Sequence, residues 1–143
     1  MWRYGIRNSV LRGVELAITG LPGGRRGDSP RSVLVLRLGN VGDIVVAIPA
    51  FRALRAKFPD AELTLLTSPT KRGAPGAAEV LAGYGVFDDM MVYYADESSK
   101  PGFLLKLRRM IIEKQIDLVV ALPNHLTGLW SWGKYAFLFG ACG

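Results

Sequence analysis

From residue 32 onward, the spacing of the hydrophobic positions changes repeatedly along the chain. Short runs of branched apolar residues, such as Val33-Leu34-Val35, are typical of strands buried on both faces. They alternate with stretches in which apolar residues recur every three or four positions, as in helices. The pattern predicts strands at 33–38, 62–67, 90–94 and 117–122 and helices at 43–57, 77–83, 102–114 and 125–139. Because strands alternate with helices, we expect an α/β fold with a doubly wound parallel sheet.

The segment before residue 32 has a different pattern. Within residues 1–21, apolar side chains recur at the spacing of one helical face and predict a helix. Residues 22–31 hold three glycines, two prolines and no large apolar side chain, so we expect a linker. The chain thus divides into a basic helix with its linker, 1–31, and a globular domain, 32–143. Two interpretations of the helix stay open: it lies on an anionic membrane surface, or it is a packed or poorly ordered terminus.

The positive charge is concentrated near the N-terminus. The net charge is +6, and residues 1–32 hold six arginines against Glu15 and Asp28, which makes +4. The remaining residues carry 12 basic and 10 acidic groups, which makes +2. A basic segment favours an anionic partner, either lipid head groups or nucleic acid. We do not expect nucleic-acid binding, because the globular part is nearly neutral and lacks a basic face with interleaved aromatic residues.

Several classes of protein are excluded by what the chain contains. With Cys142 as the single cysteine and His125 as the single histidine, neither an internal disulfide nor a multi-histidine metal site can form. No apolar run reaches the roughly 20 residues that span a bilayer. The N-terminus has no small-residue cleavage site before Pro22, which argues against a signal peptide. We therefore expect a cytoplasmic protein that is at most peripheral on the inner face of the plasma membrane.

The most informative segment is the turn between the first strand and the first helix of the domain. It reads RLGNVGD, from Arg37 to Asp43. Ligands of open α/β sheets bind beyond the carboxyl ends of the strands, so this turn faces a ligand. Its two glycines, Gly39 and Gly42, allow close approach of a ligand to the backbone. The turn has neither the G-x-G-x-x-G spacing of a dinucleotide site nor the ending of a P-loop.

Individual residues of this turn allow a structural and a functional interpretation. Asp43 is either a first-turn carboxylate that complements the helix dipole or a catalytic base, and the turn alone favours the first. Arg37 lies in a strand with little room for a charge, so we expect it to point to a crevice or to pair with a carboxylate.

A second turn, Pro123–Thr127, follows the last predicted strand. If the two strands are neighbours, Asn124 and His125 share one crevice with Asn40 and Asp43. Asn124 as a helix cap and His125 as a surface histidine remain the simpler interpretations.

The residues around these turns resemble a known family. Residues 33–54 read VLVLRLGNVGDIVVAIPAFRAL, residues 58–63 read FPDAEL, and 116–120 and 122–124 read IDLVV and LPN. Together they closely resemble the start of glycosyltransferase family 9, the lipopolysaccharide heptosyltransferases and their relatives. The resemblance covers roughly residues 32–143 and implies the N-terminal, Rossmann-like half of a GT-B enzyme. In place of the Asn124-His125-Leu126-Thr127 turn, relatives often carry serine and a basic residue.

The resemblance implies a reaction and a division of labour. It implies that this domain binds the acceptor, a lipid-linked or polysaccharide glycan, and that a C-terminal domain binds the nucleotide-sugar donor. Asp43 is the implied catalytic base for inverting transfer of a heptose-like sugar, with neither metal nor other cofactor. Binding of the acceptor is assigned to the following residues: Arg37, Gly39, Asn40, Gly42, Asn124 and His125.

The chain stops at Gly143, where the family continues into its donor domain. We therefore expect a fragment or truncated product that does not transfer sugar alone. A non-catalytic Rossmann-like binding module is the alternative.

Overall fold

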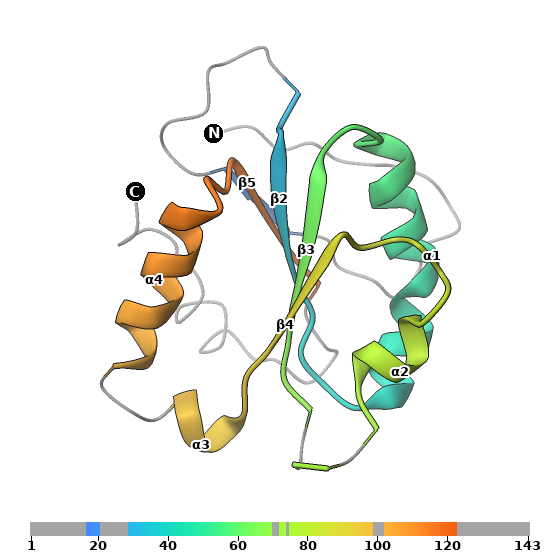
Figure 1. The fold of residues 1–143 in the computed structure, drawn as a ribbon. Helices are drawn as coiled ribbons and strands as arrows, with labels where there is room; N and C mark the ends of the chain where they lie inside the picture. The colour runs from blue at the N-terminus through green and yellow to red at the C-terminus, as the bar shows by residue number, and fades with distance from the viewer. Residues whose placement is uncertain (1–16, 21–28, 70–71, 74, 99–101, 123–143) are drawn as a thin grey trace.

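The computed structural model describes residues 17–20, 29–69, 72–73, 75–98 and 102–122, which form a five-stranded sheet covered by helices (Figure 1). The strands are β1 (Ala17–Gly20), β2 (Ser32–Leu36), β3 (Glu62–Thr67), β4 (Asp89–Val92) and β5 (Leu118–Ala121). The helices are α1 (Val41–Lys57), α2 (Ala77–Leu81), α3 (Ala95–Ser98) and α4 (Phe103–Glu113). Within the described residues, each strand and helix predicted from residue 32 onward is present, with its ends shifted by at most two residues, and only the short helix α3 was not predicted. The helix expected at 125–139 lies outside them.

The sheet has the connectivity of a doubly wound fold. Its strand order is β1-β5-β2-β3-β4, and β2, β3, β4 and β5 are parallel. The chain runs outward from β2 to β4 and then crosses to the other side of β2, where β5 pairs with it. The direction of the strand order therefore reverses between β2 and β5. In doubly wound sheets such a switch point is where ligands bind, at the carboxyl ends of the strands.

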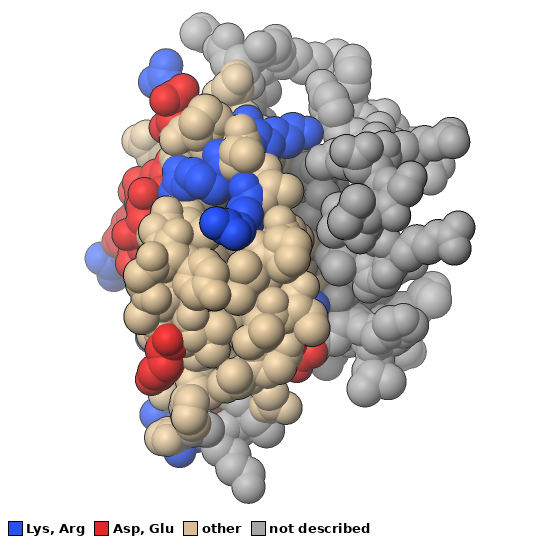
Figure 2. Space-filling model, turned by 90° about the vertical axis from the view of Figure 1, so that its right-hand side faces the viewer, with Lys and Arg blue, Asp and Glu red and all other residues tan. Residues whose placement is uncertain are grey.

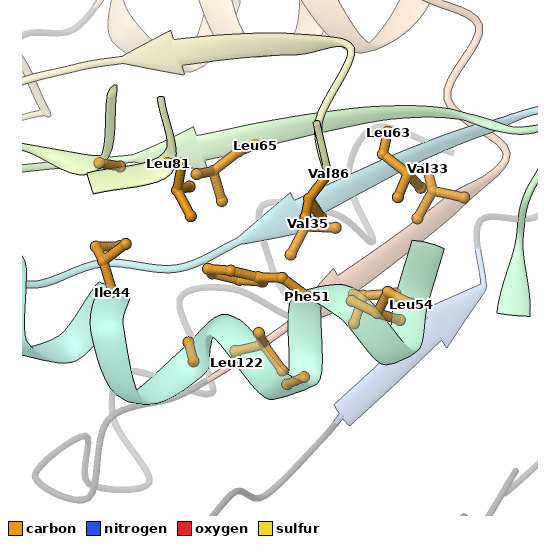
Figure 3. Close-up of a cluster of buried hydrophobic side chains, with 14 of the residues drawn as sticks. Val33, Val35, Ile44, Phe51, Leu54, Leu63, Leu65, Leu81, Val86 and Leu122 are labelled. Atoms are coloured by element: carbon orange, nitrogen blue, oxygen red, sulfur yellow. The ribbon is translucent and has the colours of Figure 1, made fainter. Parts of the chain in front are cut away.

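Helices cover both faces of the sheet, as that connectivity requires (Figure 1). β2 is buried along its whole length, and its side chains alternate between the two faces. Val33 and Val35 pack with α1 and α2, whereas Leu34 and Leu36 pack with α4. Figure 3 shows the first of these cores, in which the side chain of Phe51 projects from α1 toward the sheet. The prediction of an α/β fold with helices on both faces is confirmed.

Strand β1 corrects one prediction. A helix was expected over residues 1–21, but Ala17–Gly20 form a strand that pairs antiparallel with β5, so the sheet is not purely parallel. The physical reason is tertiary: β5 offers an unpaired edge, and the β-branched pair Ile18-Thr19 suits a strand. Residues 1–16, for which the same helix was predicted, lie outside the described residues.

The first half of helix α1 is apolar on its outward face as well as on its buried face. Val45 and Val46 are 48% and 64% exposed, on the side of α1 away from the sheet. In Figure 2 this side of the molecule shows a broad area without charge and a group of basic side chains at one end. The last turn of α1 carries Arg55 and Lys57. Among the described residues, every helix is too short or too polar to cross a bilayer.

Candidate functional site

The candidate site lies at the switch point, defined here as the carboxyl ends of β2 and β5 with the β2–α1 turn, Arg37–Asp43. β2 and β5 are in register up to Leu36 and Ala121, and the N–H of Leu122 donates to the carbonyl of Leu36 at 2.9 Å. The two strand ends are thus fixed side by side. The strands that precede the two predicted turns therefore end as neighbours on the same edge of the sheet. The second turn, Pro123–Thr127, lies outside the described residues, so its opening on this edge stays a prediction.

Arg37 ties the two strand ends to the start of α1. Its Nη1 donates to the carbonyl of Leu122 at 3.0 Å, and its Nε and Nη2 donate to the carbonyl of Asp43 at 3.2 and 3.1 Å. Nη2 also lies 3.4 Å from Oδ1 of Asp43. Burial lowers the pKa of Arg37 from its ordinary value, against the opposing effect of the Asp43 carboxylate. The guanidinium nevertheless stays charged, because arginine does not deprotonate in proteins.

Asp43 holds its carboxylate at the start of α1. Its Oδ2 accepts the backbone N–H of Asn40, the N-cap residue, at 2.9 Å. The structural interpretation of Asp43 as a first-turn carboxylate is therefore confirmed. The contact leaves the side chain 32% exposed, while that of Arg37 is only 7% exposed. The buried guanidinium of Arg37 thus holds the carboxylate of Asp43 in a fixed position that solvent can reach.

Gly39 makes room for that carboxylate. Its backbone φ is +136°, a value that residues other than glycine rarely adopt. A Cβ at this position would lie 2.3 Å from Oδ2 of Asp43. By contrast, a Cβ on Gly42 meets no atom within 4 Å, and Gly42 has no positive φ. Only the first of the two glycines is required by the conformation of the turn.

The predicted site residues are thus only partly brought together. The turn unites Arg37, Gly39, Asn40 and Asp43, and Gly42 is exposed on the first turn of α1. Asn124 and His125 lie outside the described residues, so their place at the site stays a prediction. Leu122, the last described residue before them, contacts Arg37 through its carbonyl.

Two further carboxylates on this edge were not singled out from the sequence. Glu79 accepts the N–H of Gly76 at the start of α2, at 2.8 Å, and Glu97 accepts the N–H of Tyr94 before α3, at 3.2 Å. These backbone hydrogen bonds lower the pKa of both glutamates, and Arg72 contributes for Glu97. An acidic residue three positions after a helix cap is the sequence signal for such contacts. Glu97 was missed because α3, with only four residues, was not predicted as a helix. Helix α2 was predicted over 77–83, but its cap is Gly76, which has no side chain that marks a helix start.

Within the described ranges, His, Cys, Asp and Glu side chains form no cluster of three or more that could hold a metal ion. Comparisons of the chain with protein-family models, with curated proteins and with solved structures found no match. The function therefore has to be argued from the geometry of the switch point.

Proposed function

We propose that this domain is the acceptor-binding, N-terminal half of an inverting GT-B glycosyltransferase related to glycosyltransferase family 9. The observation that carries the proposal is the Asp43 carboxylate, which is fixed at the switch point and open to solvent. Arg37 holds its Oδ1 and the Asn40 N–H holds its Oδ2. A base that is immobilised before substrate arrives does not need to be ordered during the reaction.

In the proposed reaction, Asp43 takes the proton of one acceptor hydroxyl. The oxygen then attacks the anomeric carbon of a nucleotide-sugar, the bond from that carbon to the diphosphate oxygen breaks, and the configuration inverts. The nucleoside diphosphate leaves with the electron pair. The donor binds to a further domain, and the lipid-linked or polysaccharide acceptor binds at the switch point.

Asp43 can act as a base only on a hydroxyl that it contacts directly. We expect proton transfer to accompany formation of the bond to the sugar, with the hydroxyl oxygen within about 2.6–3.2 Å of the carboxylate.

A non-catalytic binding module is the alternative, and one observation favours it. Both carboxylate oxygens of Asp43 already serve the fold, one in the ion pair with Arg37 and one at the cap of α1. In that case the carboxylate would be needed for its shape and its hydrogen bonds, and its ability to accept a proton would be irrelevant.

Replacing Asp43 by asparagine distinguishes the two functions, because the amide keeps the shape and loses the basicity. In a protein that joins this domain to a nucleotide-sugar-binding domain, we expect D43N to lower kcat about 10²- to 10⁴-fold with little change in KM. Glu79→Gln is the matched control, since Glu79 has the same capping position in α2 and should leave kcat unchanged. Equal kcat for D43N and wild type would leave only the binding module.

Acceptor binding can be measured on the chain as it stands. We expect oligosaccharides from deacylated lipopolysaccharide to shift the backbone amide NMR signals of residues 37–43, in D43N as in wild type. If these oligosaccharides bind elsewhere or not at all, the acceptor assignment is wrong.

A membrane partner belongs to the same proposal. A lipid-linked acceptor lies at a bilayer, and the basic segment before residue 17 would hold the domain at the cytoplasmic face. The test is co-sedimentation with anionic vesicles at low and high salt, with and without residues 2–16. The deletion stops at residue 16 because Ala17–Gly20 belong to the sheet. Equal binding by both proteins would show that the segment is no anchor.

A further inference from the structure

Four described helices run from the carboxyl edge of the sheet, and the first three of them start with a carboxylate of their own, whereas α4 has no acidic residue in its first turn. In α1 it is Asp43, in α2 Glu79 and in α3 Glu97, and each accepts a backbone N–H three residues earlier. In α/β proteins that bind phosphate, the ligand's oxygens occupy this place at the helix start. Here the protein supplies the anion itself.

At α1, the longest of the three helices, the carboxylate fills the place of a ligand's oxygens most completely. The Asp43 carboxylate lies directly against Gly39, where a Cβ would be 2.3 Å from Oδ2. The close approach that a glycine turn offers to a ligand is therefore taken by a side chain of the same turn. A phosphate oxygen placed there would overlap the carboxylate and repel it.

The described arginines on this edge do not offset that negative charge for a ligand. Arg37 is buried and directs its guanidinium at Asp43 and at the carbonyl of Leu122. Arg72 is paired with Asp96 at 3.1 Å and with Glu97 at 3.0 Å. Recognition of a diphosphate by these arginines would require them to leave carboxylates that they already contact.

We propose that Asp43 is a specificity-determining residue that excludes phosphate and diphosphate groups from the switch point, so that the group bound there carries no negative charge. The inference goes beyond the proposed function, because it depends on the position of the Asp43 charge and holds whether or not Asp43 accepts a proton. A nucleotide diphosphate then has to be bound by residues outside the β2–α1 turn.

The test is a titration of the ¹⁵N-labelled full chain with inorganic pyrophosphate at constant ionic strength, followed at the amides of residues 39–44. The wild type should show no saturable shift at these amides. Asp43→Ala empties the position and should show saturable binding of pyrophosphate at these amides. Its affinity should be at least about tenfold above the limit that the titration sets for the wild type, because a like charge is removed from the helix start. Asp43→Asn keeps the shape and should gain less than Asp43→Ala.

Glu79→Gln is the control, since it removes one negative charge from the same edge without opening the α1 position. An equal gain in Glu79→Gln would attribute the effect to net charge and overturn the proposal. Saturable binding of pyrophosphate at residues 39–44 of the wild type would also overturn it, and this arm needs no variant. So would a folded Asp43→Ala protein that gains nothing. If the oligosaccharides do not bind at residues 37–43, the proposed function is wrong, whereas this inference is unaffected.

Discussion

The two edges of the sheet use the same kinds of charged residues at different depths of burial. At the amino edge, Lys114 bridges the starts of two strands, with its Nζ 2.9 Å from Glu62 and 2.8 Å from Asp89. The Asp117 carboxylate accepts the N–H groups of Arg31 and Ser32 at 2.8 and 3.1 Å. At the carboxyl edge, Arg37 joins two strand ends to a helix start from a buried position.

The difference lies in how deeply the cation is buried, since the carboxylate is the more exposed partner at both edges. The side chains of Lys114 and Glu62 are 23% and 47% exposed, so water screens that pair and its contribution to stability is small. Arg37 is 7% exposed, and Asp43 is the partner that solvent reaches. The ion pairs and hydrogen bonds of the amino edge thus join the starts of neighbouring strands. Those of the carboxyl edge hold the Asp43 carboxylate in a defined position. A buried cation costs desolvation energy, which is justified where a charge has to be held in place.

The largest difference between the edges should follow removal of each cation. Arg37→Met leaves the carbonyls of Leu122 and Asp43 without their donor and should lower the free energy of unfolding by about 3 kcal/mol. Lys114→Met, at the more exposed pair, should cost about 1 kcal/mol or less. Urea unfolding followed by circular dichroism measures both. Equal losses would mean that burial does not distinguish the two edges.

Backbone conformation gives the second comparison. Gly39→Ala places a Cβ against Asp43 at a φ of +136° and should cost about 2 kcal/mol. At the amino edge Gln115, after α4, has a φ of 47° and donates its N–H to Ile112 while Ile116 donates to Ile111. Gln115→Gly should therefore stabilise the protein by about 0.5 kcal/mol, since glycine suits this helix end. The midpoint temperature of thermal unfolding should fall for Gly39→Ala and rise for Gln115→Gly.

The smallest effect concerns acid stability at the amino edge. Hydrogen bonds from Lys114 and from the N–H of Met90 lower the pKa of Asp89. Because the folded pKa is the lower one, the stabilisation is present above the unfolded value of about 3.9 and is lost as pH falls through the folded value. Asp89→Asn should be less stable than wild type at pH 7, and the two should converge at about pH 2. A constant difference in urea midpoint across this range would contradict the cause given for the shift.

How far the sequence predicts this molecule depends on how local each feature is. Runs such as Val33-Leu34-Val35 and Val119-Val120 are buried on both faces and identify their strands without further information. Helix α1 begins at Val41, two residues before the predicted start, because Asn40 is its cap and Asp43 stands in its first turn. Gly39 and Asp43 could be recognised from the sequence, because a turn that leads from a strand into a helix favours glycine, and the first turn of a helix favours an acidic residue.

Features that depend on distant parts of the chain were beyond the sequence patterns. Arg37 contacts the carbonyl of Leu122, 85 residues away, and no periodicity indicates that pairing. Strand β1 was missed for the same reason, because Ala17–Gly20 become a strand only where the edge of β5 is available. The roles of Asn124 and His125 stay predictions.

Strand β1 also has a practical consequence for where the folding unit begins. It covers the outer side of β5, whose Val119 and Val120 are fully buried. A chain trimmed at residue 32, the boundary that composition suggests, would leave the hydrogen-bonding groups of β5 open to other molecules. Unprotected apolar edge strands recruit further strands and promote aggregation. We expect such a trimmed chain to be recovered as insoluble material, whereas a chain that begins just before Ala17 keeps this edge closed.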